Sequence, residues 1–255
     1  HTAFLMPTRK DLARWLVRPD HPLTARVMVN RIWLHHFGEG IVSTPEDFGT
    51  LGSSPSHPQL LDWLAREFIE NNWSVKHIHR LIMTSSAYRQ SSASNAEQDE
   101  HSRQVDPENR LLWRQRLRRM DAEPLRDAML SVAGLLDKSI FGHAIPVARR
   151  PDGEVTIADG QTNYRRSIYV QVLRGNPLTM LHAHDQPVME TNCIRRSRST
   201  VSTQSLTILN SDDSVAYAQA FADRALKEAP ESPVDFATLT AWSRSATAEE
   251  LTTFE

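Results

Sequence analysis

The feature that most constrains the fold is a series of helix-length segments whose apolar residues recur every three or four positions. The segment 22–38 is the clearest of them. Pro22 suits the first turn of a helix, and Gly38 suits its C-terminal stop. Its apolar stripe is wide enough to face a core and comprises Ala25, Met28, Val29, Ile32, Trp33 and Phe37. The pattern predicts a mainly α fold.

Similar signals recur along the chain. Thr8 is a plausible N-cap for a helix over 9–17, Ser56-His57-Pro58 opens a third helix, and Ser74 caps a fourth. Further helical stretches are expected at about 106–113, 118–136, 202–210, 212–228, 235–242 and 248–255. Loops are expected over 39–56 and over 91–105, where Ser, Asn, Glu, Gln and Asp predict a mobile connection without a core.

The composition of the sequence changes near residue 140, where prolines and glycines become frequent. The segments 155–157 and 167–173 are short and β-prone, and the second alternates apolar and polar residues like a half-buried strand. We therefore expect a multi-helix orthogonal bundle with a small two- or three-stranded β insertion at about 145–175. The expected organisation is an N-terminal tail (1–7), one helical domain with its β insertion at about 140–175 (8–228), and a C-terminal helical extension (229–255).

Composition excludes several classes of protein. With 29 basic and 31 acidic residues among 255, the chain has a net charge of -2, whereas a general nucleic-acid binder is expected to be basic. The single cysteine, Cys193, excludes an intrachain disulfide, a cysteine-based zinc site and a C-x-x-C-H haem attachment within this chain. No apolar run approaches the length of a membrane span. The start at His1 shows no signal peptide, which fits either a cytosolic protein or a fragment of a longer chain.

Several motifs in a fixed order resemble one known family. They are Pro22–Trp33, Phe37-Gly38, Glu46-Asp47-Phe48-Gly49, Ser56-His57-Pro58, Leu60–Leu64, Leu81–Ser92, Asp106–Asn109, Ala122-Glu123 with Arg126-Asp127, Arg165–Tyr169, and Gln204–Leu206 with Leu209-Asn210. Together they resemble the planctomycete-type domain of unknown function 1553, from about residue 8 to the end of the chain. Two residues depart from the pattern, because His21 stands where Asn is expected and His184 where an aromatic residue is expected.

The resemblance implies a context rather than a reaction. Such domains form the C-terminal part of exported (periplasmic or cell-surface) proteins whose upstream modules are cytochrome-c-like. It implies that the partners of this chain are other domains of the same polypeptide. Any haem would belong to an upstream module, and no cofactor is expected in this chain.

A His182-x-His184-Asp185 motif is the sharpest local hint of chemistry. Alternate histidines on an extended segment would point to one side, and zinc accepts imidazole nitrogen and carboxylate oxygen. His182 and His184 are therefore candidate metal ligands, and Asp185 is a candidate catalytic carboxylate. The alternative is a solvated or packed loop without metal.

Glu123 and Asp127 are the other candidate catalytic carboxylates. They stand four residues apart on the helix expected over 118–136, in line with Arg119 and beside Arg126. General acid catalysis needs a carboxyl with a raised pKa, and a neighbouring arginine has the opposite effect. The spacing therefore favours a ladder of i,i+4 ion pairs over an acid/base pair.

The candidate binding residues are basic, amide-bearing and aromatic side chains: Asn30, Arg31, Arg126, Arg165, Arg166, Tyr169, Gln204 and Asn210. The arginines could line a groove for an anionic polysaccharide, with Tyr169 stacking on a sugar, or they could pair with the chain's own acids. Asn30, Gln204 and Asn210 are expected to be buried side chains that bond to loop backbone.

Three functions remain open from the sequence. The first is an accessory or scaffold domain of an exported multidomain protein. The second is a hydrolase-like enzyme acting on a polysaccharide or another polymer. The third is a module that binds anions or sulfated glycans without chemistry.

Overall fold

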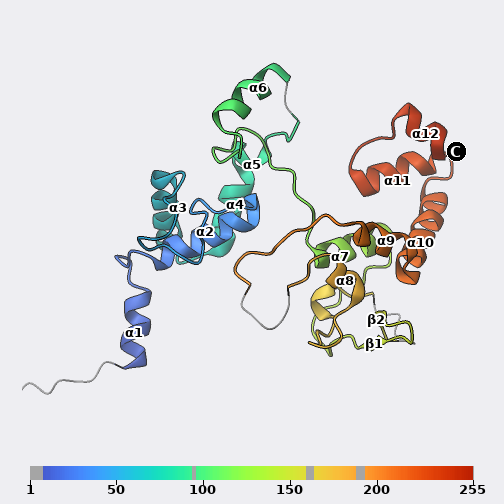
Figure 1. Cartoon of the computed structure of the whole chain (residues 1–255), viewed down its shortest axis with the longest axis horizontal. Coiled ribbons are helices and arrows are strands. Elements are labelled where there is room, and N and C mark those ends of the chain that lie inside the picture. Colours follow the sequence, from blue (N-terminus) through green and yellow to red (C-terminus); the bar gives the residue numbers. More distant parts are fainter. Residues whose placement is uncertain (1–7, 94–95, 159–163, 188–192, 255) are drawn as a thin grey trace, which may run out of the picture. The chain divides into compact units, whose positions relative to one another are not determined.

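The structure is a computed structural model that describes residues 8–93, 96–158, 164–187 and 193–254 (Figure 1). The chain divides into two compact units, an N-terminal unit that ends at Arg118 and a C-terminal unit that begins at Arg119. Each unit is described by itself.

The N-terminal unit is helical wherever it has regular structure among its described residues. Its helices are α1 (Arg9–Leu16), α2 (Thr24–Phe37), α3 (Pro58–Glu70), α4 (Val75–Thr84), α5 (Ser86–Arg89) and α6 (Ala96–Val105). Helix α2 packs against both α3 and α4. The apolar stripes predicted from the sequence meet there in one core: Ala25, Val29, Ile32, Trp33, Phe37, Ile41, Val42, Leu61, Leu64, Ala65, Phe68, Ile78 and Ile82.

Capping residues define the helix ends of this unit. Thr8 forms a capping box with Asp11, Ser74 accepts from the backbone of His77, and Gly38 ends α2 in the left-handed region at φ 83°. His21 takes over a cap at the start of α2, since its Nδ1 lies 3.1 Å from the backbone nitrogen of Thr24. An imidazole nitrogen thus replaces the asparagine oxygen expected at this position.

Two predictions for the end of this unit are wrong. Residues 96–105 form helix α6, where a connection was expected, and residues 106–113 form turns, where a helix was expected. The carboxylate of Asp106 accepts from the backbone nitrogens of Arg110 (2.9 Å) and Leu111 (2.7 Å). This local bonding competes with helical hydrogen bonds and stabilises the turn instead.

In the part that the structure describes, the C-terminal unit combines helices with one small sheet. Its elements are α7 (Ala122–Val132), β1 (Val147–Arg149), β2 (Val155–Ile157), the short 3-10 helix η1 (Ser167–Tyr169), α8 (Thr179–Ala183), α9 (Ser202–Asn210), α10 (Asp212–Glu228), α11 (Pro233–Trp242) and α12 (Ala248–Phe254). Strands β1 and β2 are antiparallel, with Val147 opposite Ile157 and Arg149 opposite Val155. Two small apolar clusters lie in this unit, one around Leu181 and one around Leu130.

The segment 167–173 is not the strand that its alternation predicted. It begins with η1 and then makes only isolated bridges, in which Val170 pairs with Ile145 and Leu173 with Asn176. Ser167 turns the chain because its backbone nitrogen donates to the Asp127 carboxylate at 2.7 Å. As a result Ile168 is 81% exposed, although Val170 is buried.

The predicted fold class is confirmed: the protein is mainly α with a small two-stranded β insertion at 147–157. Helix α7 is shorter than predicted, because it covers only Ala122–Val132 of the expected 118–136. Among the described residues, none of the helices combines the length and the apolar character that crossing a membrane requires.

Candidate functional site

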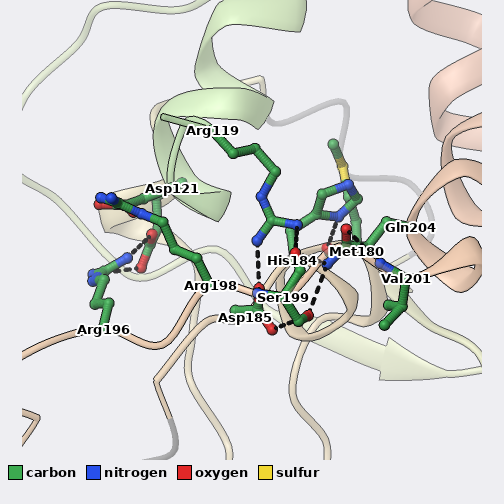
Figure 2. Close-up of polar contacts among 11 residues, drawn as sticks. Arg119, Asp121, Met180, His184, Asp185, Arg196, Arg198, Ser199, Val201 and Gln204 are labelled. Atoms are coloured by element: carbon green, nitrogen blue, oxygen red, sulfur yellow. Dashed lines mark hydrogen bonds and ion pairs between the residues drawn. The ribbon is translucent and has the colours of Figure 1, made fainter. Parts of the chain in front are cut away.

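Asp185 is the centre of the most connected group of predicted site residues (Figure 2). Its carboxylate accepts from the backbone nitrogen (2.7 Å) and the hydroxyl (2.8 Å) of Ser199, and it forms an ion pair with Arg119. Arg119 also donates to the Ser199 carbonyl at 2.6 Å. Asp185 itself has φ 65°, a conformation that aspartate tolerates better than most residues. These contacts join the segment before α7, the end of α8 and the loop before α9.

Gln204 extends this group into α9. Its side-chain nitrogen donates to the carbonyl and hydroxyl oxygens of Ser199 at 3.2 Å, and its oxygen accepts from the backbone nitrogen of Val201. Arg119, Asp185, Ser199 and Gln204 are called the Asp185 network below. The hydrogen bonds from Ser199, together with Arg119, lower the pKa of Asp185, so the network holds a carboxylate anion at neutral pH.

Two further ion pairs attach the same loop to the start of α7. Arg196 binds Glu123 through two hydrogen bonds of 2.5 and 3.1 Å. Arg198 binds Asp121 at 3.2 Å (Figure 2). Glu123 is therefore occupied by an arginine from the loop. The hydrogen bond to Glu123 raises the pKa of Arg196 further, which keeps this pair ionised.

A second group surrounds Arg126, a residue that is 1% exposed. Its guanidinium donates to the carbonyl of Arg165 (3.1 Å) and to the Ser167 hydroxyl (3.4 Å), which in turn donates to Asp127 at 2.7 Å. Arg165 lies over the ring of Tyr169, with its guanidinium carbon 3.8 Å from the centroid. Arg126, Asp127, Arg165, Ser167 and Tyr169 are called the Arg126 cluster below.

Sequence reasoning missed two titratable groups on α10. Burial raises the pKa of Asp213, and burial also raises the pKa of Tyr217; Arg126 opposes both shifts. The two residues are four apart on a helix that was predicted over 212–228, so they share one face. That spacing was the available signal, but nothing in the sequence indicated that this face would meet Arg126.

The histidine motif does not have the geometry that a shared metal site requires. The segment is not extended, because α8 runs to Ala183 and His184 forms its C-cap. His184 is buried, and its Nδ1 lies 2.8 Å from the carbonyl oxygen of Met180, so it packs in the unit (Figure 2). Within the described parts of the chain, no group of three or more His, Cys, Asp or Glu residues is arranged to hold a metal ion.

The ladder of i,i+4 ion pairs predicted among Arg119, Glu123 and Asp127 does not form in the structure. Arg119 precedes the helix, Glu123 pairs with Arg196, and Asp127 binds Ser167. Each residue of the expected ladder therefore contacts a segment distant in sequence. Helix periodicity cannot reveal such partners.

The remaining candidate binding residues are either buried and hydrogen-bonded to the backbone or exposed to solvent. Asn30 is fully buried and bonds to both backbone groups of Val42, at 3.0 and 2.9 Å, as expected for a residue that holds a loop. Arg31, Arg166 and Asn210 are exposed, so the expectation that Asn210 is buried is wrong. The structure thus brings together Asp185 with Gln204, and Arg126 with Asp127, Arg165 and Tyr169, while the other candidates stand apart.

The fold and these contacts define a mainly helical protein whose conspicuous polar residues join loops to helices through arginine and carboxylate groups. The chain matches the PSD1 family, described as proteins of unknown function (DUF1553), over residues 8–255. It therefore belongs to this family. No curated protein matches the chain. No solved structure matches it either.

Proposed function

We propose that this chain is an accessory or scaffold domain of an exported multidomain protein, with a cytochrome-c-like module elsewhere in the same polypeptide. The observation that carries the accessory role is the Asp185 network. There a candidate catalytic carboxylate is saturated by Ser199 and Arg119, and so holds three chain segments together. The family resemblance supports the exported, cytochrome-c-associated context.

The same type of contact recurs at the other candidate carboxylates. Glu123 accepts two hydrogen bonds from Arg196, and Asp127 accepts two from Ser167. A general acid or base must present a free lone pair or proton to a substrate, and these groups present theirs to the protein. Of the arginines proposed for an anion-binding groove, Arg126 and Arg165 donate to carbonyl oxygens of the protein, which supports a structural role over the hydrolase and glycan-binding alternatives.

The test separates a structural carboxylate from a catalytic one by its effect on stability. Removing a carboxylate that holds loops destabilises the protein, whereas removing a catalytic one leaves stability unchanged or raises it. Asp185→Asn and Glu123→Gln should each lower the free energy of unfolding by about 1–3 kcal/mol, because charged hydrogen bonds are lost. Chemical unfolding of the 255-residue chain measures this change.

Glu231→Gln is the matched control, because Glu231 is exposed. The substitution removes one carboxylate without changing the Asp185 network. This variant should unfold like the unsubstituted chain. An Asp185→Asn protein with unchanged stability that loses a hydrolytic activity present in the unsubstituted chain would overturn the accessory role.

The cytochrome-c association is tested on the full-length polypeptide. After limited proteolysis, the haem absorbance should remain with the part outside this chain. Covalently bound haem in the fragment that contains residues 8–255 would contradict the proposal.

A further inference from the structure

A cleft in the N-terminal unit lies outside both polar groups described above. It lies between the starts of α2 and α3 and the loop 42–55, and its volume is about 560 Å³. Pockets that bind small molecules have volumes of about 300–1,000 Å³. Its floor contains the buried side chains of Val42 and Leu61, and Phe48 and Leu23 add further apolar surface. The cleft is therefore large enough for a small ligand with an apolar part.

The loop that forms one wall of this cleft is held in place from several sides. Asn30 binds both backbone groups of Val42, and Thr44 donates to the Asp47 carbonyl (2.8 Å) while accepting from the backbone nitrogen of Ser53 (2.9 Å). Gly52 packs so tightly that a Cβ atom there would lie 2.1 Å from the carbonyl oxygen of Asp47. A wall fixed in this way is preorganised, which reduces the entropic cost of binding.

One ion pair supplies the charged groups of the cleft. The Nε of Arg26 lies 2.6 Å from Oδ1 of Asp62, and Nη1 of Arg26 donates to the Pro22 carbonyl at 2.5 Å. Among the described residues, the remaining terminal nitrogen of Arg26 and Oδ2 of Asp62 have no hydrogen-bond partner. The hydrogen bond from Arg26 lowers the pKa of Asp62, and Arg66 contributes in the same direction. The cleft thus offers one cationic donor and one anionic acceptor side by side.

This arrangement discriminates between classes of ligand. A simple anion would meet Asp62 and a simple cation would meet Arg26, so each would be repelled by one member of the pair. A purely apolar ligand would remove water from both charged groups and replace none of its hydrogen bonds. A ligand with adjacent anionic and cationic groups could bind the pair in antiparallel orientation and place an apolar side chain on the floor.

We propose that this cleft binds a zwitterionic α-amino acid with an apolar side chain. The α-carboxylate accepts from Nη2 of Arg26, the α-ammonium donates to Oδ2 of Asp62, and the side chain covers Val42, Leu61 and Phe48. This binding activity is additional to the accessory role and does not rest on it, because its residues belong to the N-terminal unit and the Asp185 network belongs to the C-terminal unit.

The test is titration of the 255-residue chain with L-phenylalanine, followed by NMR or calorimetry. The comparison ligands are 3-phenylpropionate, which lacks the ammonium, phenethylamine, which lacks the carboxylate, and N-acetyl-L-phenylalaninamide, which lacks both charges. L-Phenylalanine should bind at least about tenfold more tightly than each of them, a difference of ~1.4 kcal/mol. L-Leucine should also bind, because the floor recognises apolar surface rather than a ring.

Two substitutions separate the charges. Asp62→Asn should weaken L-phenylalanine binding about tenfold without weakening 3-phenylpropionate binding. Arg26→Gln should weaken L-phenylalanine binding about tenfold without weakening phenethylamine binding. Thr50→Trp fills the cleft from an exposed loop position and should abolish binding of all four aromatic ligands. It keeps the test valid if an ion-pair variant does not fold. Glu70→Gln, on the exposed face of α3, is the control and should bind normally.

Absence of saturable binding of both amino acids up to about 20 mM, where millimolar ligands saturate, would overturn the proposal. So would equal affinity for N-acetyl-L-phenylalaninamide, which would indicate a peptide-like ligand, or unchanged affinity in Asp62→Asn and Thr50→Trp. The unfolding free energies of Asp185→Asn and Glu123→Gln test the accessory role separately, so failure of one proposal is distinguishable from failure of the other.

Discussion

The two units are stabilised by different kinds of contact. The N-terminal unit has one core of 13 buried apolar residues, supplied mainly by α2, α3 and α4. Among its described residues, the C-terminal unit has apolar clusters of five and three buried residues, and its loops are held by the Asp185 network and the Arg126 cluster. Apolar burial is non-directional, whereas each hydrogen bond fixes one geometry. The periodicity of apolar residues therefore predicts the structure of the N-terminal unit. The structure of the C-terminal unit depends on individual hydrogen-bond and ion-pair partners.

Truncation of the N-terminal core should have the largest effect. Phe37 is 2% exposed, and Phe37→Ala removes a large side chain from this core, so the expected loss of unfolding free energy is about 3–5 kcal/mol. Hydrogen exchange should show the loss in α2, α3 and α4. Equal acceleration of exchange throughout α7–α10 would contradict a core confined to the N-terminal unit.

Removal of the buried arginine should have the next largest effect, in the other unit. Arg126→Met keeps much of the apolar stem but loses the bonds to the Arg165 carbonyl and the Ser167 hydroxyl. We expect a loss of about 2–3 kcal/mol, because buried acceptors are left unpaired. Accelerated exchange should be confined to α7, η1 and α10. Met at the exposed Arg166 is the matched control and should have little effect.

Acid should weaken the N-terminal unit through a histidine pair. Nε2 of His36 lies 2.7 Å from Nδ1 of His79, which requires one ring nitrogen to donate a hydrogen bond and the other, unprotonated, to accept it. Burial, followed by His79, Arg118 and His35, lowers the pKa of His36. The folded state therefore binds fewer protons than the unfolded chain. The stability that neutral His36 contributes is fully present above the ordinary imidazole pKa of about 6.5, and it is lost as the pH falls below that value.

Unfolding measured at several pH values between about 7.5 and 5 tests this prediction, and His36→Phe should flatten the pH dependence. The contribution of Asp185 to the C-terminal unit should respond at lower pH. Asp185 has a lowered pKa, so the stability it contributes is lost as the pH falls below about 3.9, the ordinary value for aspartate. Identical pH profiles of wild type and His36→Phe would contradict the assignment to His36.

An exposed ion pair should have the smallest effect on stability. Arg244, together with hydrogen bonds from Thr247, lowers the pKa of Glu250 to about 2. Arg244→Ala should return this pKa toward about 4.3, the ordinary value for glutamate, which NMR titration of the carboxyl measures. The melting temperature should stay constant, because exposed ion pairs contribute little. A large loss of stability would show that exposed and partly buried ion pairs contribute alike in this protein.

The contrast between the units also explains which predictions failed. Helices at 58–70, 202–210 and 212–228 are confirmed, because caps and apolar spacing are local signals. The strand expected at 167–173 is wrong, because Ser167 is held by Asp127, which lies 40 residues away. The extended His182-x-His184 geometry is wrong for a similar reason, since His184 is buried at the end of α8.

The sequence by itself determined the helical class, most helix boundaries, the role of Asn30 and the family. These properties depend on residues close in the chain, on one buried amide, or on motif order. Only the tertiary structure decided which arginine meets which carboxylate, that Asp213 and Tyr217 face Arg126, and that Arg26 and Asp62 border a cleft. These pairings join segments distant in sequence, and their partners are selected by the packing of whole elements.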